Sequence, residues 1–171
     1  MKILYAGPPI ERLHEEYAKK GRLDENAPVK SSTSIVIDAP AEKVWKLLAD
    51  MNGWPEWRSD AYVVELGEMK PDATFRWNIR GSAIRSTFAV VEPERELTWT
   101  GVAMGYIKAI DRMRLDATEN GRTRVTIEES MSGPLLTLFY SSAKLREGHE
   151  DMLRMLKTAA EGRRIADARP R

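Results

Sequence analysis

The groups of this chain best placed to do chemistry are two carboxylates and one imidazole, at Asp111, Glu129 and His149. If the last two expected strands pair as an antiparallel hairpin, Asp111 lies opposite Glu129 on one apolar face. Two like charges beside a poorly hydrated space raise at least one of the two pKa values, which leaves a protonated carboxyl able to donate to a carbonyl or to act as a general acid. His149 lies on the apolar stripe of the last expected helix, so it can point inward and bond to the pair as a base.

The same three residues also have a purely structural interpretation. A single histidine on an apolar helix face is commonly a core residue with a satisfied hydrogen bond, and perturbed carboxylates also occur in structural networks. If the register is shifted by one residue, Glu129 pairs at the sheet edge with an arginine such as Arg85, Arg112 or Arg114. We therefore assign no catalytic residue and favour recognition of the polar head of a ligand. The donors and acceptors for that head are Ser86, Ser142, Asp111, Glu129 and His149.

The elements that must position these residues follow from hydrophobic periodicity and turn residues. Residues 34–37 predict a strand, which is followed by helical segments over 41–51 and 54–57. Short alternating segments separated by turn residues then predict a meander of six strands, at 61–66, 74–79, 84–91, 96–102, 106–117 and 123–131. A long helix is expected to begin after Gly133-Pro134 and to end near Gly162, with Leu135, Leu138, Ser142, Leu145, His149 and Met152 on its inner face.

This order of elements predicts the α+β class, with a seven-stranded curved antiparallel sheet wrapped around the long C-terminal helix. A curved sheet that wraps one helix encloses space, and that space is a natural site for an apolar ligand. Alternation along the strands and the stripe of the helix predict its lining. The expected lining residues are Phe75, Trp77, Ser86, Phe88, Trp99, Asp111, Met113, Glu129, Leu138, Ser142, Leu145, His149 and Met152.

Several segments resemble a known family. They are 35–45 (IVIDAPAEKVW), 54–57 (WPEW), 97–101 (LTWTG), 123–133 (TRVTIEESMSG) and Leu156-Lys157 with Glu161. Together they resemble the polyketide cyclase/dehydrase and lipid-transport family of the START-like (SRPBCC) superfamily, over about residues 31–162. The resemblance implies the helix-grip fold. It leaves the activity open, because the superfamily includes lipid carriers, polyketide cyclases and co-chaperone-like modules. Many members carry a histidine where Asp111 stands here, so no mechanism that needs that histidine is carried over.

The first thirty residues are expected to be an addition to this domain. Ile10, Leu13 and Tyr17 form the apolar stripe of a short helix that Gly21 can stop, and a polar linker follows over 22–30. The helix can lie across its own domain or across a partner's, in which case it would make a homodimer. The division expected is therefore 1–30 for the N-terminal helix and linker, 31–162 for the helix-grip domain, and 163–171 for a basic, flexible tail.

Composition excludes several classes of function. The chain has 171 residues with 27 Lys+Arg against 26 Asp+Glu, so no global basic field favours nucleic acid. It has no cysteine and two histidines, which leads us to expect no metal and no cofactor. No signal segment or membrane span is apparent, so we expect a cytoplasmic protein without stable membrane insertion.

Three functions are compatible with these observations. We favour a non-enzymatic module that binds or carries a small hydrophobic or amphipathic ligand of lipid, polyketide or aromatic type in the cavity. The alternative is a cyclase/dehydratase-like enzyme with Asp111 or Glu129 as acid and His149 as base. A second alternative is a co-chaperone-like protein-interaction module, which would have a filled interior and an exposed apolar patch.

Overall fold

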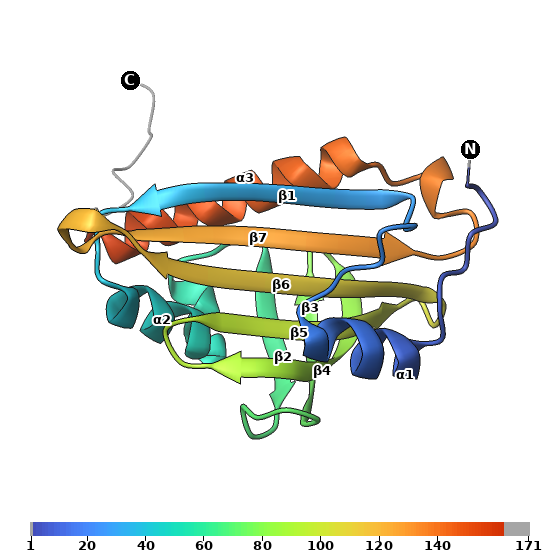
Figure 1. Cartoon of the computed structure of the whole chain (residues 1–171), viewed down its shortest axis with the longest axis horizontal. Coiled ribbons are helices and arrows are strands. Elements are labelled where there is room, and N and C mark those ends of the chain that lie inside the picture. The colour runs from blue at the N-terminus through green and yellow to red at the C-terminus, as the bar shows by residue number, and fades with distance from the viewer. Residues whose placement is uncertain (1, 163–171) are drawn as a thin grey trace.

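One curved antiparallel sheet of seven strands dominates the molecule, in the strand order β1-β7-β6-β5-β4-β3-β2 (Figure 1). The computed structural model describes residues 2–162, so the expected basic tail at 163–171 lies outside the described residues. The strands are β1 (Val29–Ile37), β2 (Ala61–Leu66), β3 (Thr74–Ile79), β4 (Ser82–Glu92), β5 (Glu96–Ala103), β6 (Ile107–Ala117) and β7 (Thr123–Ser132). The expected meander of six strands is confirmed, and β1 begins at Val29, inside the segment that was expected to be linker.

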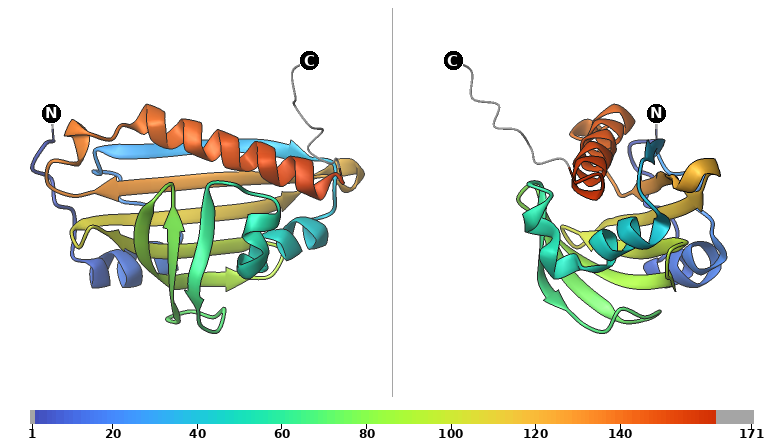
Figure 2. Two further views of the ribbon diagram at one scale, coloured as in Figure 1. Left: turned by 180° about the vertical axis from the view of Figure 1, so that it is seen from behind. Right: turned by 90° about the vertical axis from the view of Figure 1, so that its left-hand side faces the viewer.

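A single long helix, α3 (Ser142–Ala160), crosses the concave face of the sheet, as the view from behind in Figure 2 shows. The shorter helices α2 (Ala41–Ala49) and η3 (Met51–Glu56) follow β1 and pack against α3 and β2, respectively. Both the α+β class and the helix-grip arrangement predicted from the sequence are therefore confirmed. This arrangement leaves α3 as the element that faces the inner side of the central strands.

The helix α3 begins later than its apolar periodicity predicts. Leu135 has φ of +64°, which a right-handed helix does not contain, and its backbone N–H donates to the carbonyl of Ile3. One turn of 3-10 helix, η5 (Leu136–Leu138), follows, and α3 then starts after Ser141, whose hydroxyl caps the helix by accepting from the N–H of Lys144. Leu138 is consequently not on α3, and its side chain is 63% exposed.

Hydrogen bonds tie α3 to β1 near both of its ends. The Oγ of Ser142 accepts from the backbone N–H of Lys30 at 3.0 Å. Near the other end, Nζ of Lys157 donates to the carbonyl of Val36 at 2.8 Å. Between these two ties the helix runs over the inner face of the sheet (Figure 2).

The main core lies between the sheet, α2, η3 and α3. Trp54, Phe75 and Phe88 are almost fully buried in it, and the rings of Phe75 and Phe88 stack with their centroids 4.5 Å apart. Trp77 and Trp99 pack edge to face at 5.8 Å beside them. Trp54 of η3 is therefore used for core packing.

The N-terminal segment packs on the opposite, outer face of the sheet. It forms α1 (Ile10–Arg12), which continues through a π-helical turn, η1 (Leu13–Tyr17), and a 3-10 turn, η2 (Ala18–Lys20), and ends at Gly21 with φ of +65°. Its buried Leu13 contributes to a small core with Ala89 and Ile110 of the outer face. Ala89 is the extra residue of a β-bulge in β4, between Phe88 and Val90.

This docking bears on the possible homodimer. The apolar stripe of the N-terminal helix is covered by the sheet of its own chain (Figure 2, right), so a dimer built on that stripe would require the segment to be exchanged between chains. Dimerisation through this helix stays a prediction, which the molar mass in solution tests.

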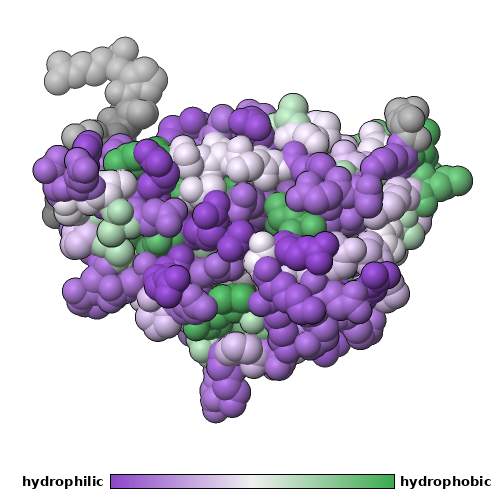
Figure 3. Space-filling model, viewed as in Figure 1, coloured by the Kyte–Doolittle hydropathy of each residue, from purple (hydrophilic) through white to green (hydrophobic). Residues whose placement is uncertain are grey.

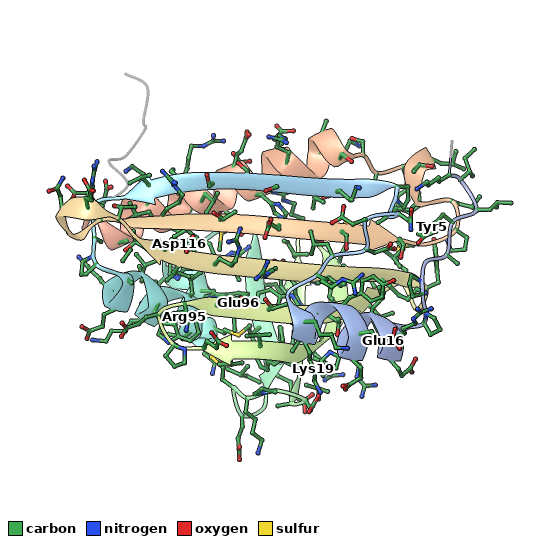
Figure 4. All side chains as sticks on the ribbon, viewed as in Figure 1. Tyr5, Glu16, Lys19, Arg95, Glu96 and Asp116 are labelled. Carbon is green, nitrogen blue, oxygen red and sulfur yellow. The ribbon has the colours of Figure 1, made fainter. Side chains whose placement is uncertain are left out.

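Ion pairs cover much of the outer face. Glu96 binds the guanidinium of Arg112 through both carboxylate oxygens, at 2.8 and 3.0 Å, and Figure 4 shows Glu96 on β5 on the same side as the N-terminal helix. Glu128 of β7 accepts from Arg112 and Arg114. The surface seen from this side is mostly hydrophilic (Figure 3). Within residues 2–162, no helix has the length and apolar character needed to cross a membrane.

Candidate functional site: a cavity between the sheet and the C-terminal helix

A cavity of about 120 Å³ lies between the inner face of the sheet and α3. A cavity of roughly 150 Å³ holds one benzene ring, whereas sites for drug-sized ligands measure roughly 300–1,000 Å³. The space therefore has the size of one ring. Of the lining residues expected from the sequence, it is lined by Trp77, Ser86, Trp99, Asp111, Met113, Glu129, Leu145, His149 and Met152.

Four residues that the sequence placed in the lining lie elsewhere. Phe75 and Phe88 are buried in the aromatic core but do not border the cavity. Leu138 belongs to η5 and is exposed, because the chain turns at Leu135 before α3 begins. Ser142 is exposed at the start of α3, where its hydroxyl is engaged with the backbone of Lys30.

The two inner carboxylates come from neighbouring strands. Asp111 of β6 and Glu129 of β7 are direct cross-strand partners, and the neighbouring pairs Met113–Ile127 and Leu115–Val125 keep the same register. The turn between these strands lies at Glu119–Gly121, and the pairing is the one expected from the sequence, without a bulge. The alternative in which Glu129 pairs with an edge arginine is wrong, since Arg112 and Arg114 bind Glu128 on the outer face.

His149 reaches this pair from α3. Its Nε2 lies 2.8 Å from Oε2 of Glu129, and the side chain is almost fully buried. The Nδ1 of His149 is buried and has no hydrogen-bond partner among the described residues, and the same is true of Oδ1 of Asp111. Asp111 keeps some accessible surface, and because it borders the cavity we attribute that surface to the cavity wall. Buried polar atoms in native proteins are almost always paired, so these two atoms are among the exceptions in the described residues.

The electrostatics of the three groups are coupled. Burial, together with the charge of Glu129, raises the pKa of Asp111 to about 7, against the opposing effects of His149 and Arg58. Burial alone would lower the pKa of His149, but its hydrogen bond with Glu129 and the charges of both carboxylates raise it above the ordinary value. The group therefore contains a carboxyl that changes its protonation near neutral pH and an imidazole that favours its charged form.

The cavity is also lined by polar residues that the sequence did not predict. Arg58 is buried, donates to both carboxylate oxygens of Asp60 at 2.8 and 3.1 Å, and stacks on the ring of Trp54. Burial raises the pKa of the Tyr140 phenol, and the Glu129 charge adds to this shift. These residues lie outside the strands and α3, so alternation carried no signal for them.

Arg80 and Gly148 meet at the lining between the sheet and α3. Arg80 and Gly81 are the two residues of the β3–β4 hairpin loop, both with positive φ, as a tight hairpin requires. The guanidinium of Arg80 lies so close to Gly148 that a Cβ there would be 2.7 Å from its nitrogens. The Arg-Gly pair between two alternating strands was the available signal for this hairpin tip.

Two groups of side chains within residues 2–162 could hold a metal ion. In one, Asp111, Glu129 and His149 each offer a ligand atom within 4.8 Å of the others. The second group, on the outer face, consists of His14, Glu15 and Asp72. The sequence predicted that no metal would bind, and that expectation is untested.

A comparison with known families finds one match. The sequence profile described as polyketide cyclase / dehydrase and lipid transport matches residues 28–161. None of the curated proteins compared with this chain matches it.

Solved structures share the fold at low sequence identity. A hypothetical protein from Helicobacter pylori is 18% identical with a TM-score of 0.69, and the match covers 80% of this chain and 90% of that one. A protein from Chromobacterium violaceum is 15% identical with a TM-score of 0.67, covering 78% and 99%. The Zhui aromatase/cyclase from a Streptomyces species is 19% identical with a TM-score of 0.61, covering 81% and 97%. At these identities the likeness extends to the fold alone.

Proposed function

The chain belongs to the polyketide cyclase / dehydrase and lipid transport family, and we propose that it binds one small hydrophobic or amphipathic molecule in the cavity beneath α3. The molecule is of lipid, polyketide or aromatic type, and the part of it that enters is about the size of one ring.

The observation that carries this proposal is the combination of apolar walls with an unpartnered buried acceptor. Trp77, Trp99 and Met152 supply the walls, while Oδ1 of Asp111 has no partner among the described residues. An unpaired buried polar atom is unfavourable by roughly 1–3 kcal/mol, and a ligand hydroxyl or N–H that reaches it removes this penalty. The polar end of the ligand therefore lies at Asp111, Glu129 and His149, with its ring against the walls that Trp77, Trp99 and Met152 form.

Native mass spectrometry of the freshly purified full chain, followed by solvent extraction, tests whether a ligand is carried along. Calorimetric titration with 4-hydroxyacetophenone, a one-ring compound with a hydroxyl and a carbonyl group, then tests the site. Met152→Trp fills the cavity and should abolish binding, whereas Met104→Trp adds the same side chain at a position that is 68% exposed and should not. Equal binding by these two variants would refute the cavity as the site.

The polar contact has its own matched pair of variants. Asp111→Asn changes the buried carboxyl, and Asp116→Asn changes an exposed carboxyl on the same strand. We expect the first to change the affinity for the one-ring compound by about tenfold, the value of one hydrogen bond to a charged group, and the second to leave it unchanged. A three-ring hydroxyanthraquinone should bind more weakly than the one-ring compound because it exceeds the volume.

The hydrogen bond between His149 and Glu129 supports a second candidate, a cyclase/dehydratase-like enzyme. In a dehydration, a base removes the α-proton of a β-hydroxy carbonyl compound and an acid protonates the hydroxyl group, which leaves as water. His149 with Glu129 is the candidate base and Asp111 the candidate acid. For an enzyme, His149→Gln lowers kcat at least about a hundredfold while the substrate still binds. Recovery of unchanged compound from the parent protein favours the carrier.

A further inference from the structure

The three polar residues of the cavity come from three separate elements and meet at one point. Asp111 belongs to β6, Glu129 to β7 and His149 to α3, and one ligand atom of each lies within 4.8 Å of the others. The strand register places the two carboxylates side by side, and α3 brings the imidazole over them.

We propose that Asp111, Glu129 and His149 form a binding site for one divalent transition-metal ion of the Zn²⁺ kind. The inference goes beyond the proposed function, because the ion binds whether or not an organic molecule is present.

Two buried atoms without a hydrogen-bond partner are the first observation that supports the metal site. Oδ1 of Asp111 is buried and has no hydrogen-bond partner among the described residues, and the same holds for Nδ1 of His149. Buried polar atoms in native proteins are almost always paired, so two unpaired atoms in one cavity indicate a bound group. The guanidinium of Arg58, which also lines the cavity, does not pair with these atoms, because it donates two hydrogen bonds to Asp60.

The charge of the site also fits a divalent cation. When a divalent ion binds, it displaces the protons of its ligand atoms, and the two carboxylates and the neutral imidazole then carry a formal charge of −2, which the ion neutralises. Arg58 and Arg80 also line the cavity; Arg58 is paired with Asp60, and the guanidinium of Arg80 lies beside Gly148 of α3.

The donor set selects the class of ion. Mixed imidazole and carboxylate ligands suit Zn²⁺ and its neighbours, whereas Mg²⁺ and Ca²⁺ prefer oxygen ligands alone. Ligand atoms around one tetrahedral Zn²⁺ lie about 3.4 Å apart, and the three ligand atoms here all lie within 4.8 Å of one another. Three protein ligands leave one position open toward the cavity, as in catalytic zinc sites, and a carbonyl oxygen of a bound molecule can occupy it.

The second group of potential ligands, on the outer face, lacks this character. Nζ of Lys19 lies 2.8 Å from Asp72 and 2.8 Å from Glu15, so an ammonium group already takes the place of a cation between these carboxylates. His14 is held by Thr100 and Asp72 through its two nitrogens. This group therefore provides an internal control of the same residue types.

The test is a calorimetric titration of Zn²⁺ into the untagged full chain after removal of metal with a chelator, without any organic ligand. We expect one Zn²⁺ per chain. Asp111→Asn, Glu129→Gln and His149→Gln should each weaken binding at least tenfold, while His14→Gln and Glu128→Gln, which change a histidine and a carboxylate outside the cavity, should not weaken it. Absence of saturable binding to the parent protein, or an equal loss in His14→Gln, would overturn the proposal.

A measurement on the parent protein guards against variants that fold poorly. Co²⁺ bound to nitrogen and oxygen ligands at a site of low coordination number has a visible absorption band that hydrated Co²⁺ lacks at that intensity, and Zn²⁺ should displace it with a stoichiometry of one. Its absence overturns the proposal independently of the variants. The organic ligand is titrated separately in the presence of chelator, so failure of the metal site and failure of the proposed function give different results.

Discussion

Asp111→Asn should stabilise the metal-free protein at pH 8 and leave its stability at pH 4 almost unchanged. Folding buries the Asp111 carboxyl beside Glu129 and raises its pKa from 3.8 to about 7. The folded state therefore binds more protons than the unfolded state between these values, so the free energy of unfolding falls as the pH rises through this window. Asparagine is a neutral isostere of the protonated carboxyl and removes this loss.

The magnitude follows from the size of the shift. A shift from 3.8 to about 7 corresponds to roughly three pKa units at about 1.4 kcal/mol each, or about 4 kcal/mol at a pH above both values. His149 is present in both proteins, but the charge of Asp111 is one of the causes that raise its pKa, so part of the stabilisation of the imidazolium is absent from the variant. Its pKa is raised in the folded state, so the stability that it contributes is also lost as the pH rises through its folded value. The difference between the two proteins should therefore grow from near zero at pH 4 to at most about 4 kcal/mol at pH 8.

The assay is urea unfolding followed by tryptophan fluorescence, at several pH values between 4 and 8 with a chelator present. Asp116→Asn is the control, because an exposed substitution on the same strand should change the free energy of unfolding by no more than about 0.5 kcal/mol at any pH. An Asp111→Asn variant that is less stable than the parent at pH 8, or a difference that does not vary with pH, would refute the reasoning.

Four further substitutions test other parts of the structure. Leu145→Ala should lower the free energy of unfolding by about 2–5 kcal/mol, and Leu138→Ala by no more than about 0.5 kcal/mol, since only the first is buried; equal urea midpoints would contradict the assignment. Leu13→Ala should cost about 2–5 kcal/mol and make the N-terminal segment sensitive to protease; unchanged resistance would mean that Leu13 does not hold it. Burial alone would raise the pKa of Glu96, but its hydrogen bonds with Arg112 outweigh this effect and lower it. The destabilisation by Glu96→Gln should therefore be present at pH 7 and disappear on acidification below pH 4. A difference that stays constant with pH would speak against this ion pair.

The strands could be predicted closely because each carries a local signal. The expected spans 61–66 and 74–79 coincide with β2 and β3, where alternation is bounded by turn residues. The pairing of Asp111 with Glu129 could be counted from the turn at Asn120, because a hairpin without a bulge has one register on the apolar face.

The start of α3 could not be predicted, because a contact distant in the sequence decides it. Leu135 and Leu138 continue the apolar periodicity of the helix, but the backbone of Leu135 binds Ile3 and adopts a left-handed conformation. Periodicity cannot distinguish a helical turn from such a loop. The lining residues Arg58 and Arg80 lie outside the regular elements, where side-chain direction follows from tertiary packing alone.

The ties at Ser142 and Lys157 make α3 resemble a beam supported at both ends. The helix should therefore be hardest to displace at these two hydrogen bonds and easiest to bend midway between them. Gly148 lies there, and glycine weakens a helix by about 1 kcal/mol relative to alanine. A larger ligand would bend α3 around Gly148 and leave the ends of the helix bonded to β1. Related chains that bind ligands of other sizes should therefore differ in the side chains near Gly148, whereas the tilt of α3 should stay the same.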